Sequence, residues 1–368
     1  IRNARHSWNF ATKCPVKTDG TLQDPSTVLG TPSNVDKSQD FVFGDWGPVE
    51  AQWRLSAEGH SVLLDAVLKL NPTQAWTDFF QPGIISKHNS VIANINHYTE
   101  AMPSAKDYKI PGFVNENTLV VCCSYSGNTE ESLEMLEQAQ AKNAIITCVT
   151  SGGKLEEITK EKNYNHIIIP KGHPPRGAFG FGFPPIFYLL SHYKVISNDY
   201  ISQFKNAVKM IDTEKGNILY AAKIATEKLY NKIPVIYSDA NYEGIAVRFR
   251  QQVNENSKML CWHHVIPEMN HNELVGWTTK NENLAVVIFR NDDDYFRTQK
   301  RMEVNKTVFE KYTSTIVELY SKGDTQLEKA LYLVHVGDWI SLLLGEKKGI
   351  DISEVNVITH LKDELAKI

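Results

Sequence analysis

Residues 118–131 read Thr-Leu-Val-Val-Cys-Cys-Ser-Tyr-Ser-Gly-Asn-Thr-Glu-Glu, and this stretch indicates the class of fold. Residues 118–123 form an apolar run of the length of a buried strand, and a polar turn follows at once. The pattern over 130–142 then predicts a helix with Leu133, Leu136 and Ala139 on one face. A buried strand, a polar turn and a helix form the repeating unit of α/β domains with parallel sheets.

The same alternation continues toward the C-terminus in two series. The first series predicts strands over 118–123, 144–150 and 166–170, helices over 130–142 and 155–162, and a long irregular loop over 171–185. The second predicts strands over 234–238, 258–265 and 284–290, and helices over 243–256, 295–312, 325–344 and 353–366. Helices over roughly 184–230 would connect the two series. The chain is therefore expected to contain two α/β domains.

The expected domain organisation follows from these series. Residues 1–60 read as an irregular N-terminal segment, 61–195 as the first domain, 196–232 as connecting helices and 233–368 as the second domain. A length of 368 residues is ample for two domains that each bury a core.

Composition excludes several classes of partner. Lys and Arg number 39 against 43 Asp and Glu, a net charge of −4, which argues against binding to nucleic acid or to an anionic membrane surface. Hydrophobic residues at 42% and charged residues at 22% are typical of a globular protein. No stretch approaches the roughly 18 to 20 apolar residues of a membrane span, and the first residues carry no apolar block of a signal peptide. We expect neither nucleic acid nor membrane as a partner.

The cysteines indicate a reducing compartment. There are five, Cys14, Cys122, Cys123, Cys148 and Cys261, and none forms a CxxC pair. The last four lie in strand-like runs, where a cysteine usually serves as a small core hydrophobe. With neither a disulfide framework nor a zinc pattern, a cytoplasmic location is expected.

The turn after the first strand has the chemistry of an anion site. Ser124, Ser126 and Thr129 place three hydroxyls before a helix whose first N–H groups lack intrahelical partners, and Gly127 permits a tight turn. Such a helix start can hold a phosphate without Lys or Arg. Alternatively, Asn128 and Glu131 form a capping box that only stabilises the helix. The residues alone leave both interpretations open, and both can hold at once.

Together with residues 150–155 (Thr-Ser-Gly-Gly-Lys-Leu), this turn resembles the sugar isomerase (SIS) domain. Later motifs narrow the match: Pro174-Pro-Arg-Gly177, Asn254-Glu-Asn256, residues 267–277 (Pro-Glu-Met-Asn-His-Asn-Glu-Leu-Val-Gly-Trp), and a C-terminal helix carrying Leu361-Lys362. In this order, over about residues 107–368, they resemble the bifunctional phosphoglucose/phosphomannose isomerase family. The resemblance implies two SIS-type three-layer α/β/α domains with central parallel sheets, flavodoxin- or Rossmann-like.

The resemblance also implies the reaction and its partners. It implies interconversion of glucose 6-phosphate and fructose 6-phosphate, and of mannose 6-phosphate as well, through an enediolate. Ser124, Ser126 and Thr129 would hold the phosphate. The small-molecule substrates are sugar phosphates, no cofactor and no metal are needed, and the enzyme would be a cytoplasmic homodimer. The active site would lie in the cleft between the two domains.

Four residues match the catalytic positions of the family. Glu255 matches the proton-transfer base and Arg176 the arginine beside the enediolate. His271 matches the histidine that assists ring opening from the partner subunit, and Lys362 a lysine near the ring oxygen or O1. Without the family, Glu255, Arg176 and Lys362 would each be interpreted as an ordinary surface residue. Glu268 and Glu273 would orient the His271 loop.

Two further groups could be mistaken for metal sites. His263 and His264 are neighbours on a strand, and neighbouring strand residues point to opposite faces, which makes them a poor chelate. Residues 292–294 are three aspartates, but no matching ligand spacing follows. A solvated turn before a helix is expected there.

One family feature has no match. Family members carry an early turn of the type Gly-Met-Gly-Gly-Ser, whereas the glycines before Asp107 stand singly. Three explanations stay open: a remodelled first half-domain, a phosphate loop built from other residues, or an N-terminal sequence that is not the natural reading of the gene.

Two rival functions have weaker support from the sequence. A non-catalytic sugar-phosphate-binding SIS protein would need none of the four catalytic residues, although the missing Gly-rich turn favours it. An amino-sugar isomerase of the glucosamine-6-phosphate synthase type would need a glutaminase domain with an N-terminal cysteine. Cys14 is internal and lacks that context.

Overall fold

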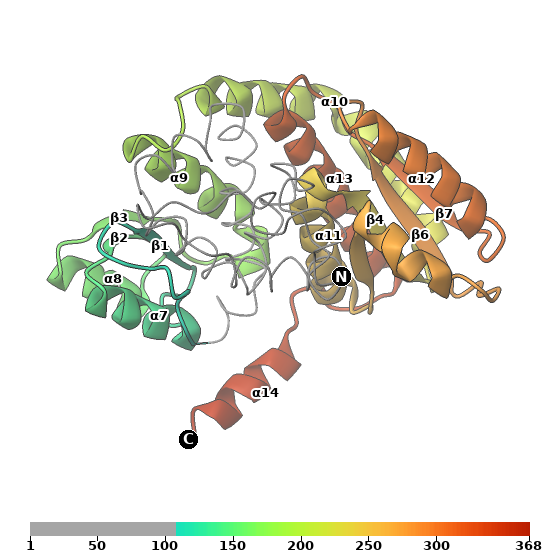
Figure 1. Cartoon of the computed structure of the whole chain (residues 1–368). Coiled ribbons are helices and arrows are strands. Elements are labelled where there is room, and N and C mark those ends of the chain that lie inside the picture. The colour runs from blue at the N-terminus through green and yellow to red at the C-terminus, as the bar shows by residue number, and fades with distance from the viewer. Residues whose placement is uncertain (1–107) are drawn as a thin grey trace, which may run out of the picture. The chain divides into compact units, whose positions relative to one another are not determined.

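The computed structural model describes residues 108–368, which fall into two compact units. The first ends at His166, and the second spans 167–368 (Figure 1). The expectations for residues 1–60, for Cys14 and for the Gly-rich turn lie outside the described residues, and the domain boundaries drawn from sequence stay a prediction.

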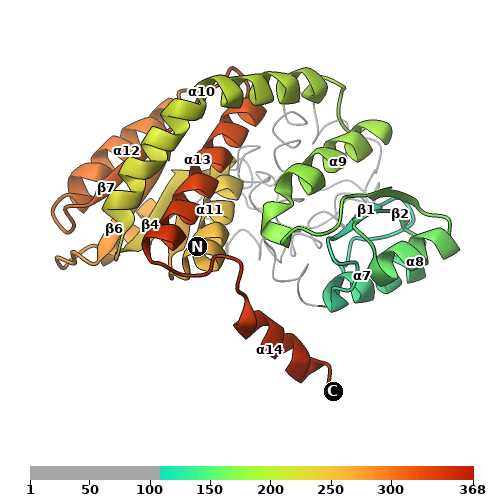
Figure 2. The same cartoon turned by 180° about the vertical axis from the view of Figure 1, so that it is seen from behind.

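The described part of the first unit has the predicted alternation of strand and helix. Its elements are β1 (Leu119–Ser124), α7 (Glu130–Ala141), β2 (Ile145–Thr150), α8 (Gly153–Glu161) and the first half of β3 (Asn165–Ile168), a strand that crosses the boundary after His166. The strand order is β1-β2-β3, and β1 runs parallel to β2 with Ser124 opposite Thr150. Helices α7 and α8 lie side by side against these strands (Figures 1 and 2). Leu136, Ala139 and Leu155 are fully buried between the helices and the sheet.

The cysteines follow the alternation of a strand. Cys122 on β1 and Cys148 on β2 are buried neighbours in register, as predicted. Cys123 is exposed, so its placement in the core was wrong, because successive residues of a strand point to opposite faces. Cys261 is half-buried just before a strand of the second unit, and none of these four cysteines forms a disulfide within the described residues.

The second unit contains a four-stranded parallel sheet. It opens with the short helix η4 (Pro175–Gly177) and the helices α9 (Phe179–His192) and α10 (Tyr200–Leu229). Then come β4 (Ile233–Asp239), η5 (Ala240–Tyr242), α11 (Glu243–Ser257), β5 (Trp262–Ile266), η6 (Glu268–His271), η7 (Glu273–Gly276) and β6 (Leu284–Arg290). The last elements are α12 (Phe296–Phe309), β7 (Ile316–Tyr320), α13 (Gln326–Lys347) and α14 (Asn356–Leu365). The strand order is β5-β4-β6-β7, with parallel neighbours throughout.

Alternate residues of the central strands serve two cores, which makes this unit three-layered. Ile236, Val287 and Phe289 face α10, α11 and α13, where α10 and α13 run side by side (Figure 2). Val235, Tyr237, Val286 and Ile288 pack on the other face with Met302 and Phe309 of α12. A sheet buried on both faces needs continuous apolar strands, and β4 and β6 have them. The predicted α/β fold with parallel sheets is confirmed.

The prediction of an irregular loop over 171–185 is wrong from Phe179 onward, where α9 begins. Pro184 and Pro185 lie inside this helix and each removes a backbone donor. Aromatic packing offsets that loss: Phe183 stacks on Phe179 at 4.8 Å and meets Phe187 edge-on at 5.0 Å between ring centroids. The sequence-based prediction failed here because it treated Gly and Pro only as helix breakers and did not consider aromatic stacking.

Strand β7 was not predicted because a charged residue interrupts its short apolar run. Glu318 stands in the middle of the strand, and two cations neutralise it. Arg290 donates to it at 2.8 Å and Lys306 at 2.6 Å. Pairing of that kind lets a carboxylate sit in a strand that otherwise reads as apolar.

Helix α14 ends the described chain as an amphipathic helix. Every residue of α14 is exposed, among them Val357, Ile358, Leu361 and Leu365 on its apolar side. Among the helices between residues 108 and 368, none has the length and apolar composition to cross a membrane.

Candidate active site

In the first unit the three predicted phosphate ligands lie in one turn between β1 and α7. The Ser124 and Thr129 hydroxyls are 2.9 Å apart and hydrogen-bonded to each other. Ser124 also accepts from the Gly127 N–H at 3.1 Å, and Ser126 accepts from the Asn128 N–H at 3.2 Å. Ser124 is buried, whereas Ser126 and Thr129 are exposed. The turn therefore presents two accessible hydroxyls at a helix start.

The capping-box alternative is wrong. Helix α7 begins after Thr129 and has no side-chain cap. The Asn128 side chain instead accepts from the Lys154 N–H at 3.0 Å, at the start of α8. Because no side chain occupies the first turn of α7, its amide groups keep the capacity to bind an anion. Glu130 and Glu131 in that turn already complement the helix dipole, and a phosphate must compete with their charge.

Residues 150–155 form the base of this turn. Ser151 donates to the Tyr125 carbonyl through both its N–H (3.0 Å) and its hydroxyl (2.6 Å), and the Leu155 N–H donates to the Gly127 carbonyl at 2.9 Å. Gly127 has φ +70°, and a Cβ there would lie 1.7 Å from the Gly152 carbonyl oxygen. Only glycine fits this position, so the two motifs quoted from sequence form one folded structure.

In the second unit Arg176 and Glu255 meet although 79 residues separate them. The Arg176 Nη1 donates to the Glu255 carboxylate at 3.2 Å, its Nε donates to Asn256 Oδ1 at 2.7 Å, and its Nη2 donates to the Ile352 carbonyl at 2.5 Å. Arginine has five N–H donors in a planar fork, so two remain for a ligand. The side chain of Arg176 is 9% exposed and that of Glu255 is 37% exposed. A fixed cation thus lies beside a carboxylate that solvent or a substrate can reach.

Two lysines stabilise the end of α11 where Glu255 is located. The Lys258 amino group donates to the carbonyls of Glu255 (2.6 Å) and Glu354 (2.7 Å). Lys348 donates to the Ser257 carbonyl at 2.9 Å. Cations at a helix C-terminus satisfy its last carbonyls and complement its dipole. Glu255 therefore projects from a well-anchored turn.

The sequence did not indicate the residues that support Arg176 through further hydrogen bonds. Arg248 contacts Asp338 through two hydrogen bonds of 3.1 and 2.6 Å. Asn256 donates to the Ser341 hydroxyl at 3.0 Å. One signal was available: Asp338 is the only acidic residue between Lys329 and Glu346, in an otherwise apolar helix. Such a carboxylate needs a cationic partner, but spacing does not say which one.

Neither His271 nor Lys362 touches the Arg176–Glu255 pair. His271 ends η6 as an exposed residue, and Lys362 lies on the exposed α14. Neither side chain forms a hydrogen bond or ion pair with another residue of the described chain. In the His271 loop, Glu268 accepts from Asn272 at 2.9 Å and Glu273 accepts from the Tyr237 hydroxyl at 2.6 Å, so both carboxylates contact this loop or its support.

The three aspartates at 292–294 were expected to form a solvated turn, and the structure agrees with this only in part. Asp292 is exposed and pairs with Lys329 at 2.5 Å, but Asp294 is 5% exposed, so the prediction is wrong for it. Asp294 accepts from the Asn291 backbone at 3.1 Å and from its side chain at 3.2 Å. Burial, and secondarily the nearby Asp239, raises the pKa of Asp294 to about 7. Within residues 108–368, no three His, Cys, Asp or Glu side chains could hold a metal ion.

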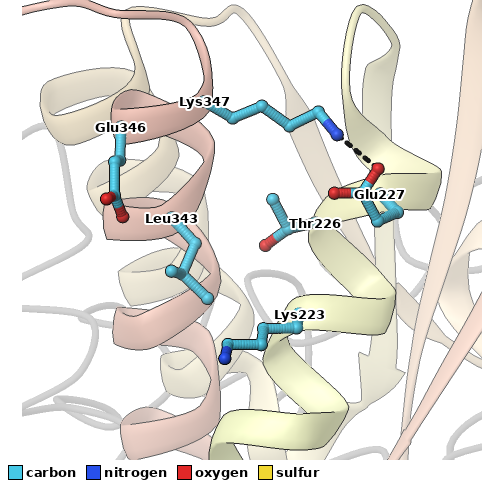
Figure 3. A pocket seen from close by; sticks show the side chains of 6 residues that line it. All are labelled: Lys223, Thr226, Glu227, Leu343, Glu346 and Lys347. Carbon is cyan, nitrogen blue, oxygen red and sulfur yellow. Dashed lines mark hydrogen bonds and ion pairs between the residues drawn. The ribbon is translucent and has the colours of Figure 1, made fainter.

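The second unit also has a hollow of about 300 Å³ between α10 and α13 (Figure 3). Its lining comprises Lys223, Thr226, Glu227, Leu343, Glu346 and Lys347. Lys347 and Glu227 form an ion pair at its edge. None of the residues singled out from sequence lines it, and its mixed charges select no class of ligand.

Comparison with known proteins decides the family. The chain is 34% identical over 288 residues to the bifunctional phosphoglucose/phosphomannose isomerase of Aquifex aeolicus, a match that covers 77% of this chain and 88% of that protein. It is 35% identical over 277 residues to the protein of the same name from Caldicellulosiruptor bescii, with 72% and 80% coverage. The chain belongs to the bifunctional phosphoglucose/phosphomannose isomerase family. As a member of that family it is an isomerase.

The family assignment agrees with two further comparisons. Residues 220–365 match the model of the bacterial phospho-glucose isomerase C-terminal SIS domain. The fold is similar to that of tagatose-6-phosphate ketose/aldose isomerase from Escherichia coli, with a TM-score of 0.52 at 12% identity over 66% of this chain and 73% of that one. That likeness concerns the fold alone. The isomerase thus has the SIS fold that its motifs predicted.

Proposed function

We propose that this isomerase interconverts glucose 6-phosphate and fructose 6-phosphate, and mannose 6-phosphate as well, with Glu255 as the proton-transfer base. The observation that carries the proposal is the Arg176–Glu255 pair: a nearly buried guanidinium 3.2 Å from an accessible carboxylate. Aldose–ketose isomerisation needs a base at the C1–C2 edge and a cation for the oxyanion that forms there. These two groups are supplied side by side.

The proposed steps use this chain's own residues. The Glu255 carboxylate removes the proton from C2 of the open-chain aldose, and the C–H electron pair forms the C1=C2 bond while O1 becomes an oxyanion. Arg176 stabilises that oxyanion with its remaining N–H donors. Return of the proton from Glu255 to C1, with transfer of the O2 proton to O1, gives the ketose. Return of the proton to either face of C2 gives the glucose or the mannose epimer.

The turn at 124–129 would bind the phosphate. Its accessible hydroxyls, Ser126 and Thr129, and the uncapped start of α7 are suitable donors for a dianion. Ser124 would orient Thr129 through the bond between their hydroxyls. The turn contains no Lys or Arg, so affinity would come from directed hydrogen bonds rather than from bulk charge.

His271 and Lys362 would open the sugar ring. Both are exposed, as side chains that act on a bound ligand or in a partner's site must be in the free chain. We propose a homodimer in which His271 reaches the site of the partner subunit. A cytoplasmic location accords with the four cysteines of the described chain that form no disulfide, because a reducing compartment keeps cysteines as thiols.

The test is turnover of the purified full chain with fructose 6-phosphate in the presence of EDTA, with both aldose phosphates followed separately. We expect both products, incorporation of solvent deuterium at the reacting carbon, and loss of about 10²- to 10⁴-fold of kcat in Glu255→Gln. Glu310→Gln, in an exposed glutamate after α12, is the matched control. Saturable binding of fructose 6-phosphate without turnover would instead support a sugar-phosphate-binding protein.

A further inference from the structure

Arg176 belongs to a closed ring of hydrogen bonds within the second unit. Its Nε donates to Asn256 Oδ1 at 2.7 Å, and the Asn256 amide donates to the Ser341 hydroxyl at 3.0 Å. Ser341 in turn donates to the Asp338 carbonyl at 2.7 Å. The Asp338 carboxylate binds Arg248, which returns to the start by donating to the Arg176 carbonyl at 3.3 Å. The ring therefore holds both the guanidinium and the backbone of Arg176.

The Asp338–Arg248 pair is the charged part of this ring. Arg248 offers two parallel N–H groups to the two carboxylate oxygens, at 3.1 and 2.6 Å, a geometry that fixes the guanidinium plane. Gln252 also donates to Asp338 at 2.9 Å. The same guanidinium lies 4.2 Å from the ring centroid of Phe179, at the start of α9. Arg248 thus links α11 and α13 to the segment that carries Arg176.

The other part of the ring is buried and closely packed. Asn256 is 4% exposed and Ser341 is fully buried. Helix α13 approaches α11 closely at this point: a Cβ at Gly345 would lie 2.6 Å from the Asn256 carbonyl oxygen. Side chains held in so tight a contact have little freedom to move. Asn256 therefore presents its oxygen to Arg176 at a fixed place.

Arg176 itself is on a weak element. It is the middle residue of η4, a three-residue turn closed by hydrogen bonds to the carbonyls of Pro174 and Pro175. A single turn of that kind does not fix the direction of a long side chain. The ring supplies the missing constraint, because it contacts the carbonyl and the Nε of the same residue.

We propose that Asp338 and Arg248 are positioning residues for the reaction: through this ring they hold the Arg176 guanidinium against the Glu255 carboxylate. The inference rests on the proposed function of Arg176, but not on which sugar phosphate is the substrate. Neither Asp338 nor Arg248 contacts substrate in this account, and both act through Arg176.

The first test is Asp338→Asn, which keeps the shape of the side chain and removes its charge. We expect kcat for fructose 6-phosphate to fall at least tenfold while KM changes less than threefold, because the phosphate contacts are elsewhere. Glu346→Gln, in an exposed residue of the same helix, is the control and should leave both constants within twofold of the wild type. An unchanged kcat in a folded Asp338→Asn protein would overturn the proposal.

A double-mutant cycle separates positioning from general structural support. In the Arg176→Lys background, Asp338→Asn should cost less than twofold in kcat, because the group that it positions is already gone. The same tenfold loss in both backgrounds would overturn the proposal. If Asp338→Asn does not fold, Arg248→Lys replaces it in the cycle. Lysine keeps the charge beside Asp338 but lacks the planar pair of N–H groups that Arg248 offers to the two carboxylate oxygens.

A readout independent of turnover tells a failure of this inference from a failure of the proposed function. In ¹⁵N-arginine-labelled protein, the Nε–H signal of Arg176, assigned by its loss in Arg176→Lys, reports the hydrogen bond to Asn256. We expect this signal to shift or broaden in Asp338→Asn and to stay in place in Glu346→Gln. A changed signal in a protein without isomerase activity would keep the ring and overturn the proposed function. An unchanged signal would overturn the ring.

Discussion

The turn at residues 124–129 of the first unit, which we propose binds the phosphate, and the Arg176–Glu255 cluster of the second unit are built in opposite ways. The turn uses six consecutive residues, 124–129, and holds its shape with hydrogen bonds that span two to five residues. The cluster joins η4, the end of α11 and the segment before α14, across sequence separations of 79, 80 and 176 residues. The first is a local structure with neutral donors, and the second is a tertiary assembly of charges.

This difference suggests a division of labour. A local turn of hydroxyls and amides suits the constant part of the substrates, the phosphate, which does not change during the reaction. A charged pair fixed by distant elements suits the carbons where charge develops, because preorganised charge stabilises a transition state most. Variants of the turn should then act on KM, and variants of the cluster on kcat.

The largest effect is expected from Gly127→Ala, which attacks the shape of the turn. The new Cβ would lie 1.7 Å from the Gly152 carbonyl oxygen, and φ is +70° there, so the backbone must move. We expect a loss of several kcal/mol of stability and loss of sugar-phosphate binding, measured by urea unfolding and calorimetry.

The matched control for Gly127→Ala is Gly216→Ala. Gly216 is inside α10, and apart from its chain neighbours and the nearby backbone of its own helix no atom lies within 4 Å of its Cβ position, so alanine should leave stability equal or raise it by up to about 1 kcal/mol. Equal behaviour of the two variants would contradict the strained geometry of the turn.

Arg176→Lys should lower kcat by about 10²- to 10³-fold with little change in KM. Lysine keeps a positive charge but cannot donate to Asn256, Glu255 and the Ile352 carbonyl while also binding an oxyanion. Steady-state kinetics measure the effect, and Arg297→Lys, in an exposed arginine of α12, serves as the control. A rise in KM at constant kcat would place Arg176 in substrate binding instead.

Thr129→Val should raise KM for fructose 6-phosphate about tenfold at nearly constant kcat, the size of one lost hydrogen bond to a charged group. Valine keeps the shape of threonine and removes the hydroxyl that contacts Ser124 at 2.9 Å. Thr118→Val, just before β1 begins, should change KM less than twofold. A tenfold loss in kcat in Thr129→Val would break the proposed division.

The smallest effect on activity is expected at Asp294, in the turn between β6 and α12 of the second unit. Burial raises the pKa of Asp294 to about 7, so the folded state binds its proton more tightly than the unfolded state. Its contribution to stability is present below pH 4 and is lost as the pH rises to 7. Asp294→Asn removes this loss of stability at high pH, because asparagine does not titrate. Its amide N–H can also donate to the Asn291 Oδ1, which has no hydrogen-bond partner in the described chain.

We therefore expect the stability of Asp294→Asn relative to wild type to rise between pH 4 and 8, by on the order of 2 to 4 kcal/mol. Turnover at pH 7 should change little. Urea unfolding across this range measures the difference, with Asp363→Asn on the exposed α14 as the control. A difference independent of pH would show that Asp294 is charged in the folded protein across the whole range.

The sequence predicted what is local and missed what depends on tertiary contacts. The strands and helices from β1 to α8 have strong periodicity, and most of the second unit agrees with its pattern to within a few residues. The sequence did not predict that a helix begins at Phe179, because some of the aromatic residues that stabilise it, such as Phe204 of α10, lie far along the chain. The sequence did not predict strand β7, because the charge of Glu318 is neutralised by Arg290 and Lys306, which belong to other elements.

The same limit applies to the site. Arg176 and Glu255 were singled out through the family motifs, and no spacing rule could have joined residues 79 positions apart. Asp338 and Arg248 are 90 residues apart, and their ion pair became visible only with the fold. Asn128 illustrates the reverse: a local rule assigned it to α7, whereas it caps α8 because the 150–155 segment folds against it.

The most direct test of the division of labour compares Thr129→Val and Glu255→Gln in the same preparation. The dissociation constant of fructose 6-phosphate and kcat are measured for each variant. We predict a weakened dissociation constant with nearly wild-type kcat for Thr129→Val, and the reverse for Glu255→Gln. If both variants lost affinity and kept kcat, or both lost kcat and kept affinity, binding and proton transfer would not be divided between the two regions.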